Sequence, residues 1–195
     1  EDRYALLEEH LERLARSAGY FDFPFDASAV RKVLDSFAQT LPPAPHKVRL
    51  LLARDGALSC AGELLLFVPP PSVLRVAVAK SPVDAGDPFL YHKTTRRALY
   101  EGARLEAPDC DETILWNGRG EVTEACSANL VVELDGLLVT PPVCCGLLAG
   151  TFRASLLEKG EVVEKVVTLD DLRRADRIWL VNSVRGWREA LFEPT

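Results

Sequence analysis

The sequence contains no methionine, and its three histidines and five cysteines follow no metal-binding or redox pattern. No C-x-x-C motif occurs, two cysteines are adjacent, and an odd number of cysteines does not suggest a disulfide framework. We therefore expect reduced thiols, a cytoplasmic location and no metal site. Because the chain begins at Glu1 without an initiator methionine, we also expect a piece of a longer polypeptide or a trimmed chain.

Long apolar runs and an excess of positive charge are also missing. No apolar stretch approaches the roughly 20 residues that span a bilayer as a helix, so we expect no membrane segment. The chain has 23 Lys and Arg against 29 Asp and Glu, a net charge of −6. This balance disfavours a general nucleic-acid binder, because phosphate binding needs a basic surface. Apolar residues make up 48% of the 195 residues, enough for a substantial core.

The first part of the chain predicts two helices followed by strands. Apolar side chains recur at helical spacing over residues 5–19 and again from Asp26 or Ser28, the candidate caps, to about residue 39. Segments with strand-like composition follow at 47–54, 57–67 and 73–80. This pattern predicts a small α/β domain.

The remainder of the chain is rich in predicted strands. An Asp135-Gly136 pair marks one hairpin turn and Gly118-Arg119-Gly120 another. Helices are predicted from Thr94 or Thr95 onward, after the glycine loop that ends at Gly150, and after a Thr168 cap. We therefore expect an α+β fold with a small N-terminal α/β domain (1–82), an interdomain linker (83–92) and a larger strand-rich domain (93–195).

Three features of the chain are consistent with an anionic cofactor. The glycine loop opens a helix whose N–H groups suit a phosphate, although an ordinary loop-to-helix turn has the same pattern. Glu124 ends a predicted strand, where its carboxylate faces either a cationic heteroatom or solvent. Lys93 follows an aromatic and apolar segment, so it is either a partly buried, reactive amine or a solvated lysine at a helix start.

Basic and hydroxyl side chains near these features have alternative interpretations too. Arg96 and Arg97 follow Lys93 closely, and cations at a helix N-terminus are unfavourable unless an anion is near. Arg13 borders the apolar stripe of the first helix, as either a packed boundary residue or a bidentate phosphate ligand. Ser127, like Asn129, is either a phosphate ligand or a turn former.

Five segments, taken in order, resemble the fold-type IV pyridoxal phosphate (PLP) enzymes: HLERLARSA, HKTTRR, EVTEACSANLVV, LVTPPVCCGLLAGTFRA and WLVNSVRG. That family includes branched-chain and D-amino-acid aminotransferases and 4-amino-4-deoxychorismate lyase. The resemblance runs from about Leu6 to Phe192. The HKTT and NSVRG details look most like the lyase, especially the lyase-type segment fused behind a chorismate-aminating domain. Ala149 and Arg96 depart from the common pattern, where proline and asparagine are frequent, but neither removes a catalytic group.

The resemblance implies a role for each candidate residue. Lys93 falls on the lysine that bonds PLP as a Schiff base and later moves protons. Glu124 falls on the carboxylate that pairs with the pyridine nitrogen. Arg13 falls on the arginine that clamps the cofactor phosphate. The remaining phosphate-binding positions fall on Ser127, Thr151, Phe152 and Ser183.

The resemblance also implies an architecture and an activity. PLP would lie between a small N-terminal domain and a larger strand-rich domain, usually in a homodimer. The leading expectation is a lyase of folate biosynthesis that converts a small molecule, 4-amino-4-deoxychorismate, to 4-aminobenzoate and pyruvate. Arg97 and Arg185 are candidates for its carboxylates. The alternatives are an aminotransferase with the same catalytic residues and a non-catalytic α+β partner domain that has lost PLP.

Overall fold

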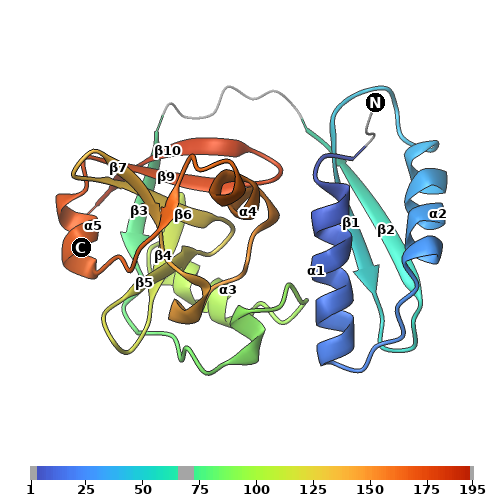
Figure 1. Ribbon diagram of the computed structural model, residues 1–195, viewed down its shortest axis with the longest axis horizontal. Helices are drawn as coiled ribbons and strands as arrows, with labels where there is room; N and C mark the ends of the chain where they lie inside the picture. The colour runs from blue at the N-terminus through green and yellow to red at the C-terminus, as the bar shows by residue number, and fades with distance from the viewer. Residues whose placement is uncertain (1–3, 66–72, 194–195) are drawn as a thin grey trace. The chain divides into compact units, whose positions relative to one another are not determined.

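The computed structural model describes residues 4–65 and 73–193 of the chain (Figure 1). Their contacts form two compact units, Glu1–Pro69 and Pro70–Thr195. Both units combine helices with strands, and the second is built on one large sheet, so the predicted α+β class is confirmed. Within the described ranges, none of the helices combines the length and apolar character required to cross a bilayer.

The first unit packs two helices against a β-hairpin. Its elements are α1 (Leu7–Tyr20), α2 (Ala27–Ala38), β1 (His46–Leu52) and β2 (Leu58–Leu64). The predicted cap of the second helix is confirmed, because Asp26 Oδ1 accepts two backbone N–H groups of the first turn, at 2.8 and 3.2 Å. The apolar stripes of the helices meet the hairpin in a core that includes Leu11, Val30 and Leu34.

The second unit is an eight-stranded sheet in the order β5-β4-β3-β10-β9-β6-β7-β8. Its strands are β3 (Leu74–Val78), β4 (Glu112–Trp116), β5 (Val122–Ala125), β6 (Asn129–Leu134), β7 (Leu137–Thr140), β8 (Val163–Glu164), β9 (Arg177–Asn182) and β10 (Gly186–Phe192). Its helical segments are η1 (Pro88–Leu90), α3 (Ala98–Leu105), η2 (Val143–Cys145), α4 (Thr151–Glu158) and α5 (Leu169–Arg174). Both predicted hairpins, β4–β5 and β6–β7, are antiparallel pairs.

The strand β3 belongs to the second unit, although the sequence placed it in the first domain. It pairs in parallel with β4 and with β10. Three of its five residues are buried, as expected for a strand inside a sheet. Val83 and Leu90 of the predicted linker are also buried in a cluster of this unit. The contacts therefore divide the chain before residue 82, between Pro69 and Pro70.

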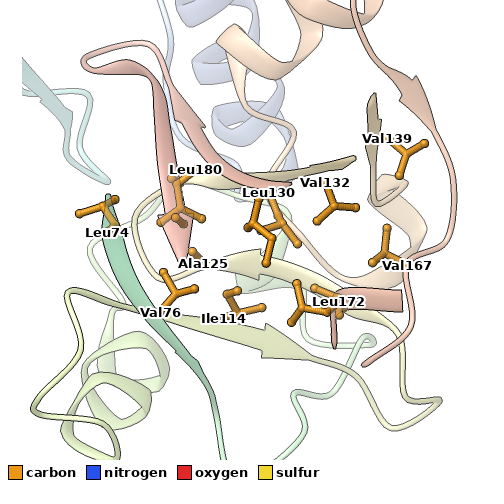
Figure 2. Packing of buried hydrophobic residues seen from close by; sticks show 14 of the residues in the cluster. Leu74, Val76, Ile114, Ala125, Leu130, Val132, Val139, Val167, Leu172 and Leu180 are labelled. Carbon is orange, nitrogen blue, oxygen red and sulfur yellow. The ribbon is translucent and has the colours of Figure 1, made fainter. Parts of the chain in front are cut away.

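The largest apolar core of the second unit lies against its sheet (Figure 2). Val76 of β3, Ile114 of β4 and Leu130 of β6 are fully buried there, and Leu172 of α5 packs into the same cluster. Strands fixed in this way have rigid ends. The ends of β4, β5 and β6 carry the polar side chains from which the candidate site is built.

Candidate active site

The carboxyl group of Glu124, on β5, is buried and held from two sides. The Tyr100 hydroxyl, on α3, donates to its Oε1 at 3.0 Å. Asn129 Nδ2, the first residue of β6, donates to its Oε2 at 3.3 Å and to the carbonyl oxygen of Leu148 at 2.9 Å. Asn129 therefore links Glu124 to the glycine loop, and two of the three features that the sequence singled out lie side by side.

Burial dominates the electrostatics of Glu124. Desolvation raises the pKa of this carboxyl to about 8, although hydrogen bonds from the Leu148 backbone and from Tyr100 lower it. The charges of Lys93 and Arg97 also lower the pKa. Alone, the carboxyl binds a proton near neutral pH. A cation placed against it would favour the carboxylate, so the site is suited to pairing with a positively charged group.

Lys93 lies in the segment that joins η1 to α3. The helix begins at Ala98, with Arg97 as its N-cap, so the prediction of a helix start at Thr94 or Thr95 is wrong. The lysine is exposed rather than partly buried, and its segment forms no helix or strand. Its charge nevertheless acts on Glu124, which identifies the two groups as electrostatic neighbours.

Two arginines that follow Lys93 lie over aromatic rings. The guanidinium of Arg96 is 4.2 Å from the centre of the Phe89 ring, and that of Arg97 is 4.0 Å from the centre of the Tyr100 ring. Arg97 Nη2 also donates to the carbonyl oxygen of Cys126 at 2.5 Å. The rings therefore offset part of the repulsion between these cations, for which the sequence led us to expect an anion. The role of Arg97 toward a substrate carboxylate stays a prediction.

The backbone of the glycine loop passes very close to the Asn129 side chain where α4 begins. A Cβ atom at Gly150, the N-cap, would lie 1.9 Å from Asn129 Oδ1, so this position accepts only glycine without rearrangement. The cap residue has no side chain to offer the first turn, whose N–H groups and positive end favour an anion. Thr151 is buried at this helix start and Phe152 packs on an apolar cluster of the unit.

Ser127 lies at the tip between β5 and β6, beside the β9–β10 turn. Its hydroxyl donates to Glu112 Oε1, which also accepts from Arg104 Nη2 at 2.6 Å. Its carbonyl oxygen accepts from Asn182 Nδ2 at 3.3 Å, across to the turn that carries the predicted Ser183 and Arg185. Arg185 is exposed in that turn. The structure thus brings Ser127 and the turn together, and their roles toward a phosphate or a substrate stay predictions.

Arg13 belongs to the first unit. It lies half-buried on α1, with Nη2 3.2 Å from His10 Nδ1. Its predicted contact with a cofactor phosphate stays a prediction. Within residues 4–65 and 73–193, no group of His, Cys, Asp and Glu side chains is arranged to hold a metal ion.

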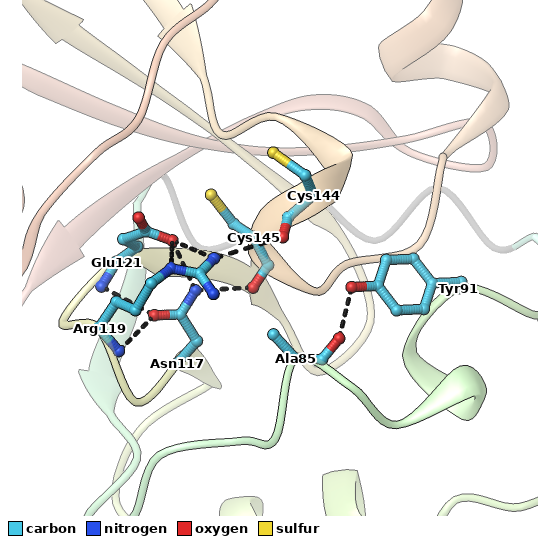
Figure 3. Close-up of polar contacts among 7 residues, drawn as sticks. All are labelled: Ala85, Tyr91, Asn117, Arg119, Glu121, Cys144 and Cys145. Carbon is cyan, nitrogen blue, oxygen red and sulfur yellow. Dashed lines mark hydrogen bonds and ion pairs between the residues drawn. The ribbon is translucent and has the colours of Figure 1, made fainter.

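A second polar cluster supports the loop that precedes Gly150 (Figure 3). Arg119 and Asn117 donate to Glu121 Oε2 at 2.6 and 2.7 Å, and these bonds lower the pKa of that carboxyl to about 2. Asn117 Nδ2 also donates to the carbonyl oxygen of Cys145 at 2.8 Å. The cluster ties the β4–β5 hairpin to η2. A cavity of about 380 Å³ lies beside it, between residues 83–86 and the hairpin turn.

Tyr100 is a residue of the site that the sequence analysis missed. The available signal was its spacing: it follows Arg97 by three residues on an expected helix, and such pairs lie on one face. It also lies seven residues after Lys93. A tyrosine in an amphipathic helix is usually part of the core, and its contact with Glu124 depends on a strand 24 residues away.

The chain matches known proteins over nearly all its length. Residues 1–191 match the family model described as amino-transferase class IV. A Schizosaccharomyces pombe protein provisionally named aminodeoxychorismate lyase is 29% identical, over 92% of this chain and 80% of its own length.

Solved structures show the same similarity. A Mesorhizobium loti protein provisionally named amino-acid aminotransferase has a TM-score of 0.89 and 34% identity, covering 96% of this chain and 92% of its own. The 4-amino-4-deoxychorismate lyase of Pseudomonas aeruginosa has a TM-score of 0.80 and 25% identity, covering 96% of this chain and 77% of its own. Similarity therefore extends to proteins with two different names.

Proposed function

Because the chain belongs to the class IV aminotransferase family, whose members are PLP-dependent enzymes of fold-type IV, we propose that it is a lyase of that family. Its reaction would convert 4-amino-4-deoxychorismate to 4-aminobenzoate and pyruvate, a step of folate biosynthesis. The names of the S. pombe and P. aeruginosa relatives support this choice. The observation that carries the PLP chemistry of this proposal is the buried carboxyl of Glu124 beside the glycine loop and near the charge of Lys93.

The residues present fit PLP at two points. A buried carboxyl with a pKa of about 8 gains from a cationic partner, and a protonated pyridine nitrogen is such a cation. Beside it, the N-terminus of α4 has no side-chain cap, and its positive end favours a phosphate. When bound, PLP would supply an electron sink for charge that develops on the substrate.

Side chains of this chain would bind the cofactor and move protons. The amine of Lys93 would bond the cofactor. Once the substrate amine had displaced it, the freed amine would take a proton from the substrate and return it. Glu124 would keep the ring nitrogen protonated. The burial of its carboxyl would exclude water from this pair, which strengthens the interaction. The cofactor phosphate would be held by Arg13, Ser127, Thr151, Phe152 and Ser183.

An aminotransferase is the second candidate. The M. loti protein named for that activity is 34% identical to this chain, more than the P. aeruginosa lyase at 25%. Both reactions begin with the same amine exchange and proton removal, so Lys93 and Glu124 serve either one. The substrate decides between them.

The test has two stages. Purified protein incubated with PLP should show the visible absorbance of a lysine Schiff base, and Lys93→Ala should abolish it while Lys159→Ala, at an exposed lysine of the same unit, should not. If no variant differs from the wild type and no PLP is taken up, the chain is a non-catalytic domain.

The second stage separates the two reactions. Incubation with 4-amino-4-deoxychorismate should release 4-aminobenzoate and pyruvate in equal amounts. Amino transfer from a donor amino acid to 2-oxoglutarate, without release of 4-aminobenzoate, would refute the lyase.

We also propose that the chain works as a cytoplasmic homodimer, with a fused upstream chorismate-aminating domain. The mass of the full polypeptide in analytical ultracentrifugation tests whether it forms a homodimer.

A further inference from the structure

Helix α3 is fastened to the β4–β5 hairpin by a polar contact at each of its turns. Arg97 Nη2 bonds the Cys126 carbonyl oxygen at 2.5 Å, and the Tyr100 hydroxyl bonds Glu124 Oε1 at 3.0 Å. At the far end, Arg104 Nη2 bonds a carboxylate of β4 at 2.6 Å. The Lys93 segment runs directly into this helix. The docking of α3 therefore holds Tyr100 against Glu124 and anchors the end of the segment that carries Lys93.

The contact in the middle of the helix is the one that reaches the buried carboxyl. Tyr100 is 6% exposed, and the guanidinium of Arg97 covers its ring at 4.0 Å. Burial and the neighbouring carboxyl raise the pKa of Tyr100, so the phenol stays neutral and donates its proton throughout the neutral range. A buried donor of this kind stabilises the ionised form of its acceptor more than the protonated form.

We propose that Tyr100 is a positioning residue that acts through Glu124: its hydroxyl fixes Oε1 and favours the ionised carboxylate that pairs with the ring nitrogen of the cofactor. This inference rests on the proposed function. Tyr100 itself touches neither Lys93 nor the substrate in this scheme. It differs from Asn129, whose amide sits on the other carboxyl oxygen and also bonds the glycine loop.

Charged and titratable groups face Glu124 from several elements. Lys93 and Arg97 precede α3, Tyr100 lies on it, and the Cys126 thiol follows β5. Both cations lower the pKa of the carboxyl, and burial opposes them. Because Tyr100→Phe removes a single hydrogen bond and keeps the ring beneath Arg97, the two charges and the packing stay in place. A change in the pKa of Glu124 then measures the effect of the phenol hydroxyl alone.

The experiment compares Tyr100→Phe with Tyr91→Phe. Tyr91 supplies a matched control, since its hydroxyl donates to the Ala85 carbonyl oxygen at 2.6 Å and not to a carboxylate. In the PLP-free protein, carbon-13 NMR of labelled glutamate follows the Glu124 carboxyl, which is identified by its loss in Glu124→Gln. We expect Tyr100→Phe to raise this pKa by about one unit, the size of a hydrogen bond to a charged group, and Tyr91→Phe to leave it unchanged.

Cofactor binding gives the second readout. At neutral pH the dissociation constant for PLP should rise about tenfold in Tyr100→Phe, and the ratio to wild type should shrink as pH rises above the carboxyl pKa. A merely structural role would give a loss that does not depend on pH, which would overturn the inference. Incorporation of 3-fluorotyrosine at position 100 keeps the bond with a more acidic donor and should lower the Glu124 pKa, so the idea stays testable if Tyr100→Phe folds poorly.

The two readouts also separate the inference from the proposed function. If the wild type takes up no PLP, the proposed function fails, while the NMR titration still measures the coupling of Tyr100 to Glu124. If the wild type binds PLP and Tyr100→Phe matches Tyr91→Phe in both measurements, the inference fails and the proposed function stands.

Discussion

Replacing Glu124 by glutamine should remove a specific pH dependence from the stability of the PLP-free protein. Burial raises the pKa of this carboxyl from 4.5 to about 8, so the folded chain binds its proton on the order of a thousand times more tightly than the unfolded chain. At about 1.4 kcal/mol for each tenfold change, the proton contributes at most about 5 kcal/mol to the free energy of unfolding.

The sign of the effect follows from the direction of the shift. The contribution is fully present below the unfolded pKa of 4.5 and is lost as pH rises through the folded pKa of about 8. Glu124→Gln carries no titratable proton. The difference in unfolding free energy between wild type and variant should therefore change by about 2–4 kcal/mol between about pH 5 and about pH 9, in favour of the wild type at low pH.

Urea unfolding followed by tryptophan fluorescence measures this difference. All three tryptophans, Trp116, Trp179 and Trp187, lie in the unit that contains Glu124, so the signal reports the relevant unfolding. Glu158→Gln, at an exposed carboxylate of α4, is the control and should follow the wild-type profile. A difference between wild type and Glu124→Gln that stays constant within about 0.5 kcal/mol over this range would refute a buried carboxyl with a raised pKa.

Two further substitutions test the local geometry in the same urea assay. Gly150→Ala places a methyl group 1.9 Å from Asn129 Oδ1 and should cost about 1–3 kcal/mol, whereas Gly102→Ala on α3 meets nothing within 4 Å and should be neutral or stabilising; equal effects would contradict the close approach. Thr168→Ala removes the hydroxyl that accepts the Asp171 N–H at 3.0 Å and should cost about 1 kcal/mol, so an unchanged midpoint would argue against the cap.

Local signals in the sequence predicted local structure well. The Asp135-Gly136 pair forms the β6–β7 turn with φ values of 53° and 76°, which is the left-handed backbone that an Asp-Gly hairpin turn requires. The Thr168 cap of α5 is present, as predicted. Both features depend on residues within a few positions of one another, so the sequence pattern contains the information.

Features that depend on distant pairing were missed. β3 joins β4 and β10, which lie more than 30 and more than 100 residues further along the chain, and no spacing near β3 reveals these partners. The start of α3 was placed at Thr94 or Thr95 because nothing in the pattern separates HKTTRR from the helix. The helix begins at Ala98 instead, and its first buried side chain is Tyr100.

The site divides in the same way. A carboxylate at a strand end and a glycine loop at a helix start are local motifs, and the structure brings them together through Asn129. The basic cluster was harder to interpret, because any negatively polarised group can offset the repulsion between its cations. From the sequence we expected an anion to do so. In the structure, the faces of the Phe89 and Tyr100 rings offset part of the repulsion.

The position of Arg97 beside Tyr100 gives the basic segment a role toward Glu124. The guanidinium of Arg97, a predicted partner of a substrate carboxylate, lies over the Tyr100 ring and donates to the Cys126 carbonyl oxygen. A cation in that position supports the phenol that bonds Glu124 and lowers the carboxyl pKa directly. The arginine thus acts on the same buried carboxyl as Lys93 does. The positive charge before α3 therefore favours the ionised form of Glu124, and the roles of Arg97 and Arg185 toward substrate carboxylates stay predictions.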